Sequence, residues 1–282
     1  MTTSANTVKR KLVRREDSRI PEEFRSIFPS WATFCGKDQY GFFAGFKVNG
    51  IELTFRWIPP GSFLMGSPDT ESGRCKNEGP QHKVTLTKGF WLGETPCTRA
   101  QYQAVMGMEI HVSYKAPKDR NLPITDVSWE DCFDFFKRLH DYAPGGFPTE
   151  AEWEYACRAG TISAFNDGSD CTVPGGSDPA VERLGWHNKG GGCRPYPVKR
   201  KRPNAWGLYD MHGNVCEWCG DWFAPYKETD NVVDPTGPEM GFDRVTRGGS
   251  WGCLARSCRS ALRNWSIPGL REKYLGFRIA IG

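Results

Sequence analysis

No long apolar segment occurs in this chain of 282 residues, and none of its apolar runs approaches the roughly 18 residues that cross a bilayer. We therefore expect no membrane-spanning helix and no membrane partner. The basic residues between Lys9 and Arg15 are not followed by the apolar stretch of a secretory signal, which predicts a cytoplasmic protein. The net charge of +4 is too small to indicate nucleic-acid binding, and no zinc-finger or basic-helix pattern is present.

The sequence also lacks the short motifs of several enzyme classes. It has no glycine-rich phosphate-binding loop, no dinucleotide-binding fingerprint and no nucleophile elbow. Its five histidines are scattered singly, whereas zinc and non-haem iron enzymes usually cluster their imidazoles. These absences argue against nucleotide chemistry, serine hydrolases and metals held by histidine.

Cysteine, by contrast, is abundant. The 11 cysteines are an odd number, and the cytoplasm keeps thiols reduced, so we expect most of them to be small buried apolar side chains. Cys216 and Cys219 form a CxxC pair, and Cys253 and Cys258 are the other close pair. Four thiolates from these pairs would be a ligand set for zinc, and this alternative stays open at the level of the sequence.

Several local signals predict regular structure in the first half of the chain. Asn49-Gly50 separates two alternating apolar runs, which predicts a hairpin over residues 41–58. Thr98, Ser128 and Thr149 begin three helical patterns as N-caps, with capping boxes at Ser128 and Thr149. From Ala159 onward the chain is rich in Gly, Pro, Asn and Asp but also in Trp, which predicts an ordered body made largely of loops.

Four phrases in this order carry a family resemblance: WIPPGSFLMG at 57–66, FPTEAEWEYACRAGT at 147–161, PNAWGLYDMHGNVCEW at 203–218, and RGGSW followed by LGFR at 247–278. They closely resemble the formylglycine-generating enzyme (sulfatase-modifying factor) family. The resemblance implies an α+β, C-type-lectin-like fold with short antiparallel strands, two or three helices and much irregular loop. We expect an N-terminal extension at residues 1–40 and one domain at residues 41–282.

In the enzymes of this family, two cysteines after the Gly-Gly-Ser motif bind copper and oxidise a sulfatase cysteine. Cys253 and Cys258 follow Ser250 with the same gap between them, and paired thiolates suit Cu(I). The resemblance thus implies one possible function, a copper-dependent formylglycine-generating oxidase that uses Cys253 and Cys258 beside Ser250.

The spacing on the other side of the cysteines favours a different branch of the family. Thirteen positions separate Ser250 from Arg263, whereas the catalytic members are expected to have about three more before the corresponding arginine. The shorter form resembles a non-catalytic branch that includes the variable proteins of diversity-generating retroelements. In those proteins, mutagenesis directed at adenines rewrites fixed positions near the C-terminus while the scaffold stays constant.

This resemblance divides residues 247–278 into two classes. We expect the arginines Arg256, Arg259, Arg263, Arg271 and Arg278 to be structural, hydrogen-bonding loop carbonyls and carboxylates. The positions between the scaffold residues share no chemical type, and we predict that they bind a protein or another macromolecule. They are Gly252, Cys253, Leu254, Ser257, Leu262, Trp265, Ser266, Ile267, Leu270, Glu272, Lys273 and Tyr274.

The family also has members that hold calcium. Asp210, Gly213, Val215 and Glu217 match the positions of that site, and two carboxylates with backbone carbonyls are the hard oxygen ligands that calcium prefers. Calcium is therefore a candidate cofactor, with none certain, and copper is expected only for the oxidase.

Overall fold

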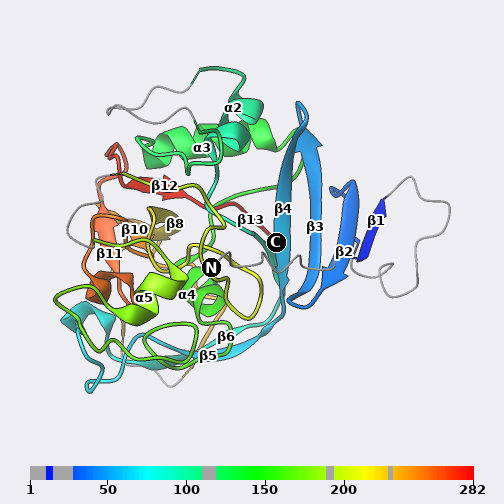
Figure 1. Cartoon of the computed structure of the whole chain (residues 1–282). Helices are drawn as coiled ribbons and strands as arrows, with labels where there is room; N and C mark the ends of the chain where they lie inside the picture. The colour runs from blue at the N-terminus through cyan, green and yellow to red at the C-terminus, as the bar shows by residue number, and fades with distance from the viewer. Residues whose placement is uncertain (1–10, 15–27, 110–118, 189–193, 228–230) are drawn as a thin grey trace, which may run out of the picture.

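The structure of the protein is a computed structural model that describes residues 11–14, 28–109, 119–188, 194–227 and 231–282. These residues fold into three sheets and a few short helices joined by long irregular segments (Figure 1). Within the described ranges, no helix is long and apolar enough to cross a membrane.

The largest sheet has six strands in the order β1-β2-β3-β4-β7-β13. The predicted hairpin forms its centre, and Asn49 and Gly50 take the positive φ angles (47° and 78°) that such a tight turn requires. The strands are β1 (Lys11–Arg14), β2 (Phe34–Asp38), β3 (Gly41–Val48), β4 (Ile51–Ile58), β7 (Phe90–Gly93) and β13 (Ala280–Ile281).

The expected boundary at residue 40 is wrong for part of the N-terminal segment. Strand β2 pairs along β3 and β1 pairs along β2, so both extend the large sheet at its edge, and Val13 and Cys35 are buried in its core. Residues 11–14 and 34–38 therefore belong to the domain, because backbone pairing and apolar burial attach them to it. Residues 1–10 and 15–27 of the expected extension lie outside the described residues.

Two smaller sheets complete the fold. One has four strands in the order β11-β10-β8-β12, and the other has three in the order β5-β6-β9. Most strand pairs are antiparallel, as expected. The pairs β12–β8 and β6–β9 are parallel, which the long connections between their two strands allow. The strands are β5 (Gly61–Met65), β6 (His82–Leu86), β8 (Cys216–Trp222), β9 (Asn231–Val233), β10 (Arg244–Arg247), β11 (Asn264–Ser266) and β12 (Leu275–Phe277).

The three predicted helices begin at the predicted residues. Thr98, Ser128 and Thr149 each accept a hydrogen bond from the backbone N–H three residues later, and the third residue returns one to the cap. The helices are α2 (Arg99–Met106), α3 (Trp129–Leu139), α4 (Glu150–Arg158) and the additional α5 (Pro179–Leu184), with short 3₁₀ turns η1 (Lys76–Glu78) and η2 (Ala255–Cys258).

Buried arginines hold the loops that pair with no strand. The Arg158 guanidinium donates to the carbonyls of Gly66 (2.8 Å), Ser163 (3.2 Å) and Ile162 (3.3 Å) while it pairs with Glu154. A guanidinium has five donors, so one side chain can satisfy several loop carbonyls that would otherwise be buried without a partner. This is how a body with little regular structure stays ordered.

Candidate functional site

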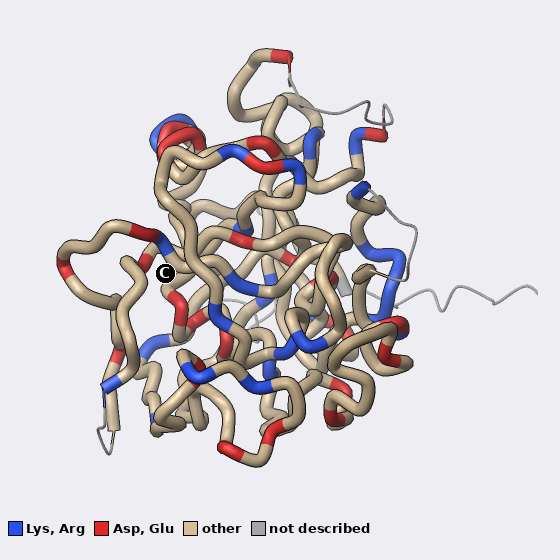
Figure 2. The backbone as a smooth tube through the Cα atoms, turned by 90° about the vertical axis from the view of Figure 1, so that its left-hand side faces the viewer, with Lys and Arg blue, Asp and Glu red and all other residues tan. Residues whose placement is uncertain are grey.

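The four-stranded sheet positions the C-terminal region. Strands β11 and β12 form the two opposite edges of this sheet, with β10 and β8 between them (Figure 1). The segment 267–274, which joins β11 to β12, therefore passes from one edge of the sheet to the other. Figure 2, which faces this side of the molecule, shows basic and acidic residues interspersed along the chain.

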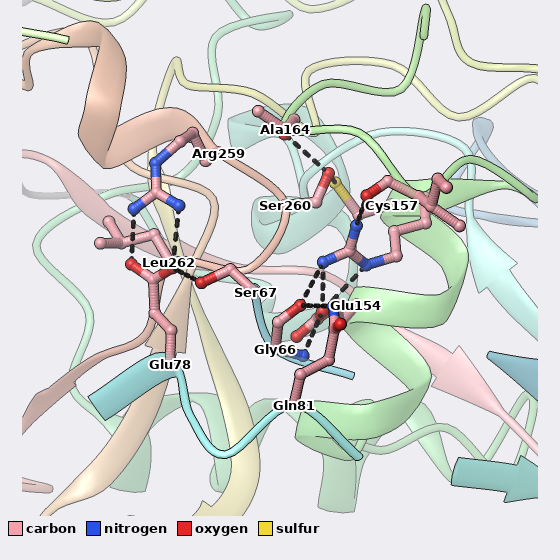
Figure 3. Close-up of polar contacts among 12 residues, drawn as sticks. Gly66, Ser67, Glu78, Gln81, Glu154, Cys157, Ala164, Arg259, Ser260 and Leu262 are labelled. Atoms are coloured by element: carbon pink, nitrogen blue, oxygen red, sulfur yellow. Dashed lines mark hydrogen bonds and ion pairs between the residues drawn. The ribbon is translucent and has the colours of Figure 1, made fainter. Parts of the chain in front are cut away.

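The residues before β11 are anchored in the interior. The Arg259 guanidinium pairs with Glu78, and the Glu78 carboxylate also accepts a hydrogen bond from the Ser67 hydroxyl at 2.7 Å (Figure 3). Arg263 makes two hydrogen bonds to Glu150, at 2.6 and 2.7 Å. Both pairs are buried, so they fix the backbone from which the exposed segment starts.

The prediction of structural arginines is confirmed for four of the five. Arg278 lies between Glu217 and the carbonyls of Gly93 and Tyr209, and the exposed Arg271 makes a two-pronged ion pair with Asp131. The prediction was wrong for Arg256, whose exposed side chain makes no hydrogen bond or ion pair with the residues that the structure describes.

The predicted binding positions are mostly at the surface. Five of the twelve are exposed and six are partly exposed. The exposed ones are Gly252, Trp265, Ile267, Lys273 and Tyr274, and the partly exposed ones are Cys253, Leu254, Ser257, Ser266, Leu270 and Glu272. One prediction was wrong: Leu262 is buried, because it lies between the two anchored arginines and its carbonyl accepts a hydrogen bond from Arg247.

The exposed side chains rest on buried or half-buried aromatic rings. Trp265 stacks on Phe223 with ring centroids 4.3 Å apart, and the Lys273 ammonium lies 5.6 Å from the ring centroid of Trp251. Trp251 itself is buried, as expected for a scaffold residue. The surface side chains are therefore supported from below but remain accessible from outside.

The sequence did not identify two exposed apolar residues near this surface. Met240 and Phe242 are 85% and 93% exposed on the loop before β10, the strand that pairs with β11. Their loop contains Gly237, Pro238 and Gly241, which marks it as a turn, but a turn pattern gives no sign of which side chains it exposes.

The two candidate copper ligands have different surroundings. Cys253 is partly exposed, and a hydrogen bond from the Cys216 thiol, together with the Ser250 hydroxyl 3.3 Å from its sulfur, lowers its pKa to about 6. Cys258 is fully buried, and burial raises its pKa well above the usual thiol value. A Cβ on Gly249 would lie 2.8 Å from the Cys258 sulfur, so the backbone closely covers this sulfur.

This burial does not fit a copper centre that is open to a substrate. Such a centre needs both sulfurs as thiolates and one side that a peptide can reach. Cys258 packs instead into an apolar cluster with Phe165, Val181 and Leu184. The arrangement at Cys258 is that of a small core residue.

The two cysteine pairs do not converge as a zinc site would require. Cys216 and Cys219 are three positions apart on β8, so their side chains point to opposite faces, and they lie in different core clusters. Among the residues that the structure describes, no group of three or more His, Cys, Asp or Glu side chains is arranged to hold a metal ion. The four-thiolate alternative is therefore wrong.

The residues expected to bind calcium are largely engaged with protein groups. Both oxygens of Glu217 accept hydrogen bonds from Arg278, and Oε2 also accepts one from the Trp153 indole. Burial raises the pKa of Asp210 to about 6, and its carboxylate accepts hydrogen bonds from Asn214 and the backbone of Lys199. Glu217 is thus held in an ion pair, Asp210 forms none with the described residues, and calcium stays a prediction.

Comparison with known proteins agrees with the fold. The family profile of the sulfatase-modifying factor enzyme 1-like domain matches residues 51–282. The formylglycine-generating enzymes of Streptomyces coelicolor and Thermomonospora curvata are 31% and 36% identical, over 79% of this chain and 87% and 91% of theirs.

Two solved structures are similar along most of the chain. Treponema denticola variable protein 1 has a TM-score of 0.72 at 27% identity, covering 85% of this chain and 98% of its own. PvdO from Pseudomonas aeruginosa has a TM-score of 0.70 at 28% identity, covering 84% and 97%. These similarities confirm the expected C-type-lectin-like α+β fold, and the chain belongs to the sulfatase-modifying factor enzyme 1-like family.

Proposed function

We propose that this protein binds a protein or another macromolecule through the surface formed by residues 252–257 and 265–274, as a variable protein of a diversity-generating retroelement does. The observation that carries the proposal is the change of environment after Arg263. Residues 258–263 are all buried, whereas Asn264, Trp265, Ile267, Lys273 and Tyr274 are exposed.

The chemistry of the exposed positions supports a recognition surface. Trp265 and Tyr274 are rigid aromatic groups of the kind that dominates binding hot spots, and Ile267 adds an apolar contact with 59% of its surface exposed. Neighbouring Glu272 and Lys273 would supply polar specificity. Because these side chains carry no ion pair of the scaffold, they can be exchanged without loss of the fold.

The similarity to Treponema denticola variable protein 1 over nearly all of that chain also supports the proposal. The decisive experiment is to sequence the gene and the DNA downstream of it in independent isolates. We expect a near-copy of the 3′ coding segment that differs at adenines, next to a reverse transcriptase gene, with substitutions confined to the exposed positions. Isolates whose differences are spread evenly through residues 247–278, with no such copy, would contradict the proposal.

A second candidate function is the copper-dependent oxidation of a sulfatase cysteine. The sequence identity to two formylglycine-generating enzymes favours it, as does the lowered pKa of Cys253 beside Ser250. The burial of Cys258 argues against it. Its test is an anaerobic Cu(I) titration of the wild type and of Cys253→Ser, followed by incubation in air with a cysteine peptide of the sulfatase type, where dioxygen is the oxidant.

The two candidates predict different outcomes in that titration. The binding protein should show no tight stoichiometric Cu(I) site, no peptide aldehyde and no difference between the two variants. The oxidase should bind one Cu(I) per chain and form the aldehyde, and it should lose both properties in Cys253→Ser.

A further inference from the structure

A cavity of about 430 Å³ lies where the start of α4, the end of β8 and the segment after β8 meet. Its volume suits a small organic molecule, and most of its wall is apolar or aromatic. The apolar lining includes Met65, Trp222, Pro225, Tyr226, Val232 and Pro235. None of the residues predicted to bind a ligand lines this cavity, so it is separate from the surface proposed above.

The wall contains one buried acidic side chain that makes no direct ion pair within the described part of the chain. Asp221 is 5% exposed, and its Oδ2 accepts a hydrogen bond of 2.7 Å from the Glu150 backbone N–H at the start of α4. Among the described residues, no lysine or arginine forms an ion pair with it. Burial, and then the nearby charge of Glu150, raise the pKa of Asp221 to about 7. The Asp221 carboxylate therefore has no cation in direct ion-pair contact, although Arg244 attracts it over a longer distance.

The other acidic residue in the wall is already neutralised. Glu150 receives two hydrogen bonds from Arg263 and one of 3.4 Å from the Tyr226 hydroxyl. Arg263 also donates to the carbonyls of Asn77 and Ala224, so its guanidinium is almost fully used by the protein. A ligand in the cavity thus finds few free donors on this side.

His82 gives the wall a second acceptor. Its Nδ1 lies 2.9 Å from the Pro80 carbonyl, and because a carbonyl only accepts, Nδ1 carries the hydrogen of the neutral ring. Nε2 is then left as an acceptor. The ring also packs edge-on against Tyr226, with centroids 4.7 Å apart, which fixes its orientation.

Gly237 packs closely against the Asp221 side chain. A Cβ at this position would lie 3.1 Å from Asp221 Oδ1 and 2.9 Å from Asp221 Cβ. Both residues line the cavity, and Gly237 takes a φ of 74°, which favours glycine. A larger residue at position 237 would therefore press on Asp221, so glycine is required where this loop packs against the carboxylate.

We propose that this cavity binds a small organic amine, with its ammonium group on Asp221 and its apolar body against Trp222, Tyr226 and the neighbouring prolines. The wall offers acceptors and aromatic faces, and both attract a cation that carries N–H donors. The ammonium would form the direct ion pair that Asp221 does not make with any described residue. This site does not depend on the proposed binding of a macromolecule.

Binding of an amine should be stronger when Asp221 is ionised, which means above about pH 7. The electrostatic potential at Asp221, and with it the pH dependence of binding, also depends on the charged and titratable groups of the surrounding elements. These are Glu150 and Glu152 of α4, His82 of β6, Arg244 of β10, Arg263, and Tyr226 and Lys227 after β8.

The test is calorimetric titration of the full chain with tryptamine and with tryptophol, its neutral alcohol analogue, at about pH 8. We expect one tryptamine to bind per chain and tryptophol to bind at least about tenfold more weakly. Asp221→Asn should reduce tryptamine binding to the level of tryptophol. The amide oxygen can still accept the Glu150 N–H, so α4 should keep its start, and an unchanged melting temperature verifies this.

Three further variants make the result decisive. Val232→Trp should block both probes because it fills the cavity, whereas Tyr274→Ala, on the separate C-terminal surface, should leave tryptamine binding unchanged. Lys227→Met should leave tryptamine binding equal or tighter, since it removes a nearby positive charge. No binding to the wild type, equal binding of the two probes, or tryptamine binding that survives in Asp221→Asn would overturn the proposal.

Discussion

Arg259 and Trp265 lie six positions apart in the sequence, yet their surroundings are opposite. Arg259 is fully buried and pairs with carboxylates from a segment about 180 residues earlier, whereas Trp265 is 46% exposed and touches the protein through one stacked ring. The comparison teaches that this fold places stabilising and surface-exposed side chains within a few residues of each other. Buried ion pairs hold the backbone, and the side chains that follow are the ones proposed to bind a partner.

The largest loss of stability is expected when a buried arginine is removed. Arg259→Leu should lower the free energy of unfolding by about 3–5 kcal/mol, because it leaves Glu78 buried without its partner. Urea unfolding followed by tryptophan fluorescence measures the loss. A change below about 1 kcal/mol would mean that the pair is not an anchor of the loops.

Two tryptophans give a matched comparison of the scaffold and the surface. Trp251→Ala should cost about 3–5 kcal/mol, since the ring is buried, while Trp265→Ala should cost about 1 kcal/mol, the value of one stacked aromatic pair. Thermal and urea unfolding of both variants measures the difference. Equal losses of stability would contradict the division between scaffold and surface.

The scaffold should also respond to pH through His212. Burial lowers the pKa of this histidine to about 4, and its Nδ1 donates to the Cys258 carbonyl at 2.7 Å. The unfolded chain binds a proton at His212 below about pH 6.5, but the folded chain does so only near pH 4. Stability should therefore fall by about 3 kcal/mol as the pH drops through this range.

The measurement is urea unfolding from pH 7 to pH 4.5 for the wild type and for His212→Asn. The comparison is needed because burial raises the pKa values of Asp210 and Asp221 to about 6 and 7. These carboxyl groups bind protons more readily in the folded state, so they oppose the trend of His212, but they do so in both proteins. Parallel pH profiles would show that His212 is not the group responsible.

The smallest effect is expected for an arginine at the surface. Arg271 pairs with Asp131 through two hydrogen bonds, but 56% of its side chain is exposed. Arg271→Ala should cost only about 0.2–1 kcal/mol, because water screens this pair. Measured beside Arg259→Leu, it shows whether burial decides what an arginine contributes. A loss as large as that of Arg259→Leu would remove the distinction.

The sequence indicated a large part of the candidate site but not all of it. The positions at Trp265, Ile267 and Tyr274 were predicted to be at the surface from the resemblance to variable proteins, and they are exposed. Leu262 was also predicted to lie at the surface but is buried. The ion pairs of its neighbours hold this stretch of backbone in the interior. The ion-pair partners of these neighbours are residues 78 and 150, and the residue types around position 262 do not predict them.

The local signals in the sequence determined the three capped helices and the Asn49-Gly50 hairpin, because capping and turn formation act over about four residues. The tertiary structure alone decided the pairing of β8 with β10 and β12, the opposite faces of Cys216 and Cys219, and the cavity beside Asp221. These features depend on contacts between distant segments. Burial and pairing between distant segments stabilise these features. A short stretch of sequence therefore cannot predict them.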